Sequence, residues 1–155
     1  MLILICILKY SGFACYDELS NTIFADSIPV CFEDMEDVLA KIKMAADPTL
    51  FLIHPTILSN KSLLDRLVCG IDGVPDTYRH TTMKSSSWNA EAALEIMCSK
   101  LSITMFECAA ADGHNSRRSY LHLASAIDLE SLQLKQSMGA LLNYLQANVF
   151  NMDSG

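Results

Sequence analysis

A stretch near the carboxyl end decides how the chain must fold: residues 128–147 read DLESLQLKQSMGALLNYLQA. Its apolar side chains recur at intervals of four, three and four residues, as they do on one face of a helix. These side chains are Leu134, Met138, Leu141 and Leu145. Asp128 stands where a capping carboxylate would accept hydrogen bonds from the first free amides. The sequence therefore predicts a long amphipathic helix over 128–147.

The length of this helix carries a second prediction. At the usual rise per residue it would extend roughly 30 Å, which is more than a small α/β core needs. Its distal half is predicted to project beyond the core, leaving four apolar side chains partly exposed: Met138, Leu141, Leu142 and Leu145. Gly139 costs about 1 kcal/mol of helix propensity relative to alanine, so its presence predicts the close approach of another element.

The first quarter of the chain has strand patterns. Residues 1–8, MLILICIL, are apolar on both faces, as expected of a central strand with helices on either side. This run is too short to cross a membrane and lacks the charged start of a signal peptide. Polar residues 17–21 separate the strand-like runs 12–16 and 22–24, which predicts an antiparallel hairpin.

The middle of the chain alternates helix and strand patterns. A helix is predicted over 33–46 and a short buried strand over 50–54, and this alternation implies a crossover connection with partly parallel pairing. The patterns further along predict short helices over 60–68, 90–101 and 120–126, and an exposed edge strand over 77–84. The fold class is therefore predicted to be α/β, a mixed sheet flanked by helices.

Composition limits what the chain can do alone. Its 155 residues are 51% hydrophobic and 19% charged, which is typical of one globular domain. The net charge is −7 and the pI is near 4.9, so the surface as a whole repels phosphate. We therefore expect the isolated chain to bind DNA poorly.

The cysteines are scattered and form no CxxC pair or zinc knuckle. Reduced, intracellular thiols are the favoured interpretation, because most of these residues lie within predicted strands or helices. A secreted domain with three disulfides is the alternative. The six positions are Cys6, Cys15, Cys31, Cys69, Cys98 and Cys108.

The sequence predicts no catalytic, cofactor-binding or metal-binding residue. The motifs GxxxxGK[ST], GxSxG and HExxH are absent, so this stretch is not itself a P-loop ATPase. His54 is a site candidate only by its position at a strand end, and we interpret it as structural. The acidic residues of 33–37 are interpreted as a solvated helix start, and three basic residues as charges on an edge strand: Arg79, His80 and Lys84.

Two smaller charged groups are also interpreted as non-catalytic. Three carboxylates that could imitate a two-metal nuclease, Asp17, Asp26 and Asp72, lie in turn-like polar stretches. The pair Arg117 and Arg118 is too small a basic cluster for a nucleic-acid site.

Three segments nevertheless resemble a known family. The run SMGALLNYLQ, preceded by ASAIDLESL, is similar to the segment where MutS proteins pass from their connector domain into the lever helices. GFACYDELSNTIF resembles the opening of the same connector in the meiotic branch of that family, and SSSWNAEAALEIMCSKL resembles its strand-to-helix passage. Residues 104–119 depart from the pattern.

The resemblance implies an RNase H-like connector domain over 1–126 and a truncated start of the lever region over 127–155. In whole members it implies a nuclear, ATP-dependent clamp on branched DNA such as Holliday junctions, acting in meiotic crossing over as a heterodimer with a second MutS homologue. ATP and magnesium would bind outside these residues, so this piece would be no enzyme. The alternative is a free-standing α/β nucleotide-binding or hydrolytic enzyme domain, which requires convergent titratable groups.

Overall fold

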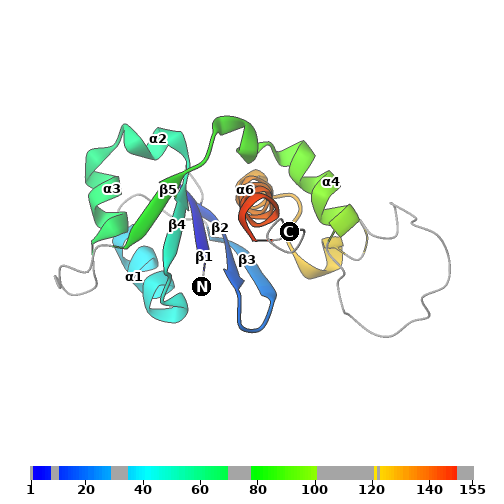
Figure 1. The fold of residues 1–155 in the computed structure, drawn as a ribbon, viewed down its shortest axis with the longest axis horizontal. Coiled ribbons are helices and arrows are strands. Elements are labelled where there is room, and N and C mark those ends of the chain that lie inside the picture. Colours follow the sequence, from blue (N-terminus) through cyan, green and yellow to red (C-terminus); the bar gives the residue numbers. More distant parts are fainter. Residues whose placement is uncertain are drawn as a thin grey trace.

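One mixed sheet of five strands, with helices on both faces, forms the body of the described part of the molecule (Figure 1). The computed structural model describes residues 2–7, 11–28, 35–69, 78–100, 121 and 123–149. The strands are β1 (Leu2–Ile7), β2 (Ser11–Asp17), β3 (Thr22–Ile28), β4 (Leu50–Ile53) and β5 (Arg79–Thr82). Their order across the sheet is β3-β2-β1-β4-β5. The predicted α/β class is therefore confirmed.

The amino-terminal strands form an antiparallel meander. β1 pairs antiparallel with β2, and β2 pairs antiparallel with β3 across the predicted turn. The Tyr16 hydroxyl donates to Asn21 Oδ1 at 3.0 Å, and Asn21 adopts a positive φ of 51°, which asparagine tolerates well. The predictions of a hairpin and of a central first strand are both confirmed.

The other two strands are added in parallel. β4 runs parallel to β1 and β5 runs parallel to β4, as the predicted crossovers require. The first crossover passes through α1 (Met35–Ala46), and the second through α2 (Pro55–Leu58) and α3 (Lys61–Val68). The short helix α2 was not predicted; its first residue is a proline, which suits the first turn of a helix.

Alternating side chains divide the core between the two faces of the sheet. Ala14 and Tyr16 of β2 face the carboxyl-terminal helices, whereas Cys15 faces the opposite way. Leu52 and Phe51 of β4 divide in the same manner. On the first face lie η3 (Ser85–Trp88), α4 (Ala90–Lys100) and α6 (Leu132–Asn148); on the second lie α1 and α3 (Figure 1).

The expectation that α6 projects into solvent is wrong. The side chains of Leu141 and Leu145 are 0% exposed, Met138 is 2% exposed and Leu142 is 6% exposed. α6 lies on β2 and β1 with its inner face, and α4 covers part of the remainder. The apolar stripe is therefore wide because it faces both a sheet and a second helix.

The start of α6 also differs from the prediction. Ser131, not Asp128, caps the helix: its Oγ accepts from the Leu134 amide at 3.2 Å. Asp128 instead accepts from the Glu130 amide at 3.0 Å in the preceding turn. The division predicted at residue 126 stays a prediction, and the described residues beyond it share the core of the sheet.

Candidate functional site

The backbone of β2 lies close against the start of α6. A Cβ atom added to Gly12 would lie 2.3 Å from the backbone carbon of Gln133 and 2.5 Å from the Leu134 nitrogen. The buried Ser137 Oγ donates to the Gly12 carbonyl at 2.8 Å. Only glycine permits this approach, because the neighbouring atoms belong to the helix backbone. We call Gly12, Gln133, Leu134 and Ser137 the β2–α6 seam.

A second close approach joins α6 to α4. A Cβ atom added to Gly139 would lie 2.6 Å from the Ala93 Cβ atom. The predicted reason for a glycine in this helix, contact with another element, is therefore confirmed. One turn further along, Asn143 Nδ2 donates to the Ser87 carbonyl at 3.2 Å and ties α6 to η3.

His54 lies at the carboxyl end of β4, where the sequence placed it. The backbone amide of Thr56 donates to its Nδ1 atom at 3.2 Å, so His54 caps α2. Its ring lies edge-on to Trp88, with centroids 5.1 Å apart and an interplanar angle of 75°. Burial lowers the pKa of the imidazole below its ordinary value of 6.5. These contacts support the structural interpretation of this histidine.

Lys43 lies in the last turn of α1, and its side chain bonds to the end of a neighbouring helix. The side chain is 5% exposed, and Nζ donates to the carbonyls of Arg66 at 2.7 Å and Cys69 at 2.6 Å, at the end of α3. The ammonium also lies 5.1 Å from the centre of the Tyr78 ring. Burial lowers the pKa of Lys43, and Cys69 opposes that shift. The sequence holds a signal for the burial of Lys43, because position 43 follows Leu39 by four residues and lies on the same face of α1.

The two candidate carboxylates that the structure describes, Asp17 and Asp26, are not brought together. Asp17 accepts from the Leu19 amide and the Ser20 hydroxyl in the hairpin turn, and these bonds lower its pKa, that from Ser20 most. Asp26 lies within β3 and not in a turn as predicted; it is exposed and accepts from the Ser27 amide at 2.8 Å. Asp26 pairs with Phe13, four positions from Asp17 along β2, a separation of roughly 13 Å. Asp72 lies outside the described residues.

The remaining charged groups lie on the surface where they are described. Asp37 is exposed on α1, while Glu33 and Asp34 fall outside the described residues. Three basic side chains are exposed on or after β5, the terminal strand of the sheet, as predicted: Arg79, His80 and Lys84. Arg117 and Arg118 fall outside the described residues.

Three cysteines can be placed with their side chains. Cys15, Cys69 and Cys98 are free thiols, and burial raises the pKa of Cys15 and Cys98. Within the part of the chain that the structure describes, no group of three or more histidine, cysteine or acidic residues is placed to hold a metal ion. In the same part, no helix is both long enough and apolar enough to span a membrane.

No protein-family model matches the chain, and no curated protein sequence matches it at a significant level. Function is therefore inferred from the packing of the described residues and from the resemblance in sequence.

Proposed function

We propose that the chain is the connector region of a MutS-family protein of the meiotic branch, similar to MutS protein homologue 5. The observation that carries the proposal is the β2–α6 seam. The two segments with the strongest resemblance, residues 12–24 and 125–145, are far apart in the sequence, yet Gly12 and Ser137 meet in the buried seam. Because the two segments pack against each other, a residue change in one would disturb the other, and this is a physical reason for both to retain the residues of the family pattern.

The sheet supports the same proposal at the level of fold. An antiparallel meander of three strands, extended by two parallel strands in the order β3-β2-β1-β4-β5, is the order expected of an RNase H-like domain. We infer this class for the sheet. Fold alone does not fix function, so the class leaves both a connector and an enzyme open.

The role proposed for this piece is mechanical and not catalytic. The whole protein would be a nuclear, ATP-dependent clamp on branched DNA that promotes meiotic crossing over as a heterodimer with a second MutS homologue. ATP, magnesium and most DNA contacts would lie outside residues 1–155. The rival, a free-standing nucleotide-binding or hydrolytic domain, needs several convergent titratable groups. His54 is the site candidate at the end of β4. Its described contacts are with Thr56 and Trp88, so they do not form a group of convergent titratable side chains.

Reading the coding sequence on both sides of these residues tests the proposal. We expect it to continue into a clamp and an ATPase segment with the motif GxxxxGK[ST]. A coding sequence that continues into an unrelated domain without this motif would contradict the proposal.

Titrating the isolated chain with Mg-ATP and with a labelled Holliday junction separates the proposal from its rival. By fluorescence anisotropy at about physiological salt we expect no submicromolar affinity for either, because the net charge is −7. A variant with Arg79→Gln and Lys84→Gln, both exposed, is the matched control. Tight junction binding that this variant loses would place a DNA site on β5. Turnover of ATP by the chain would favour the enzyme.

A further inference from the structure

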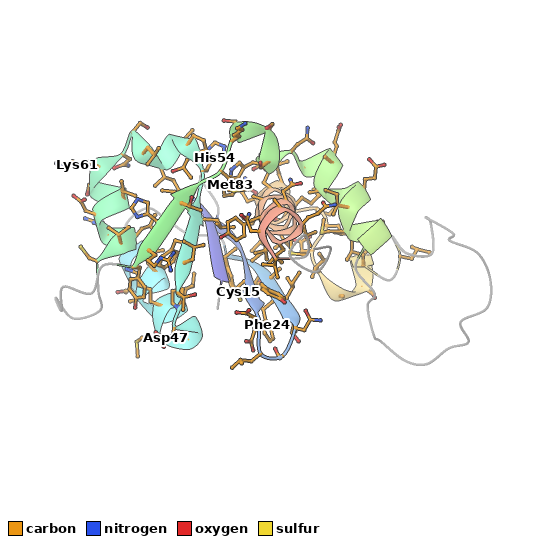
Figure 2. The ribbon with its side chains drawn as sticks, in the orientation of Figure 1. Cys15, Phe24, Asp47, His54, Lys61 and Met83 are labelled. Atoms are coloured by element: carbon orange, nitrogen blue, oxygen red, sulfur yellow. The ribbon has the colours of Figure 1, made fainter. Side chains whose placement is uncertain are left out.

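We propose that His54 is a protonation-sensitive latch that holds the first turn of α2 against Trp88 in η3. The inference is independent of the proposed function. It rests on the placement of one imidazole between two segments that follow neighbouring parallel strands. Figure 2 shows His54 at the end of the sheet beside Met83, and the Met83 amide donates to the Ile53 carbonyl at 3.3 Å.

The hydrogen bonds of the ring fix its neutral form. Because the Thr56 amide donates to Nδ1, that nitrogen carries no hydrogen, and the neutral ring must carry its hydrogen on Nε2. Thr56 Oγ1 also lies 2.8 Å from Nδ1 and can donate to it. When Nδ1 is protonated, the hydroxyl can turn and accept, but the amide cannot. Protonation therefore removes the cap from α2 and leaves the Thr56 amide facing another donor.

The surroundings of the ring oppose a positive charge. The edge-on contact with Trp88, which is 2% exposed, removes water from one side of the imidazole. The Trp88 Nε1 atom is buried with no hydrogen-bond partner. A charge placed here lacks compensation, in agreement with the burial that lowers the pKa of His54.

The charged residues of the packed elements lie elsewhere. β4, α2 and η3 contain none. On β5, Arg79 and His80 pair with Leu50 and Phe51, whereas His54 follows Ile53 at the other end of β4. The exposed Lys84 stands between β5 and η3, and Lys135 of α6 lies two turns before Asn143, the residue that contacts η3. Burial, and not a neighbouring charge, lowers the pKa of His54.

The single tryptophan makes the latch measurable. We expect the emission of Trp88 to fall as the pH decreases from about 7.5 to 5, with a midpoint below 6.5, because an imidazolium quenches an adjacent indole. Over the same range the hydrogen-exchange protection of the Thr56 amide should fall about fivefold, the value of one helix cap.

Two variants decide the origin of the transition. His54→Asn retains an N-cap acceptor but cannot be protonated, so it should fold and show a flat emission profile. His80→Gln removes an exposed histidine and should retain the wild-type profile. Circular dichroism at pH 7.5 checks that both variants are folded. A flat profile in the wild type, a midpoint at or above 6.5, or an unchanged transition in His54→Asn would overturn the proposal.

Discussion

The two faces of the sheet are built by different means. The face under α6 relies on close approach of backbones, through Gly12 against Gln133 and through Gly139 against Ala93. The face under α1 and α3 relies on large side chains and on one buried cation, Lys43. The first face should therefore be sensitive to a single added methyl group, and the second to the loss of a charge.

The largest effect should come from charging the inner face of α6. Leu141→Glu with Leu145→Glu places two carboxylates at positions that are 0% exposed. Each buried charge without a partner costs several kcal/mol, which together rival the whole stability of a typical domain, about 5–15 kcal/mol. A thermal melt by circular dichroism should show cooperative loss of the fold, whereas Ala147→Glu, on the exposed side, should melt like the wild type. A soluble, folded double variant would contradict the assignment of α6 to the core.

A methyl group in the β2–α6 seam should have the next largest effect. Gly12→Ala must displace the helix backbone, because no side chain can give way, and overpacking of this kind costs about 1–3 kcal/mol or more. Gly139→Ala meets the Ala93 side chain instead, so Ala93→Gly should rescue it.

Urea unfolding of the two single variants at positions 139 and 93 and of their double variant measures this coupling. If the changes in unfolding free energy of the two single variants simply add in the double variant, the contact between α4 and α6 is looser than described. A Gly12→Ala variant as stable as the wild type would contradict the seam itself.

On the opposite face, Lys43→Met tests the buried cation. The substitution keeps the apolar stem but leaves two carbonyls at the end of α3 without a donor, at a cost of about 1–3 kcal/mol. The loss is partly offset, because a buried ammonium is itself costly. Urea unfolding should place the net effect below that of Gly12→Ala. Lys41→Met, on the exposed side of α1, is the control and should change little.

The smallest effect should be a dependence of stability on pH through His54. Its pKa is lower in the folded chain than in the unfolded chain, so the unfolded chain binds more protons between the two values. The His54 contribution is therefore fully present above about pH 6.5 and is lost as the pH falls toward the folded-state pKa. The difference in unfolding free energy between pH 7.5 and 5 should shrink in His54→Asn. An equal difference in both proteins would contradict this.

The sequence predicted most of the elements because their periodicity is local. The alternation in residues 1–8, the polar turn at 17–21 and the stripe in α6 each follow from neighbours in the chain. The elements that cover an apolar stripe, in contrast, come from distant parts of the sequence. The burial of Leu145 depends on α4 and the sheet arriving from other parts of the chain, and for this reason its predicted exposure was wrong.

The same distinction explains the site residues. His54 could be placed at a strand end from pattern alone, but its contact with Trp88 joins residues 34 positions apart. The acceptors of Lys43, the carbonyls of Arg66 and Cys69, lie 23 and 26 positions further along the chain, so its neighbours in the sequence do not reveal them. Gly139 was interpreted correctly, because a glycine within a strong helix pattern has a cost that close packing explains.

Hydrogen exchange under increasing urea tests most directly the central claim that α6 and the sheet form one core. The amides of α6 and of β2 should exchange through the same opening, with the same dependence on urea, because the β2–α6 seam joins them. If α6 instead exchanges freely while β2 and β4 remain protected, the helix is a separate unit, and the claim of a single core is contradicted.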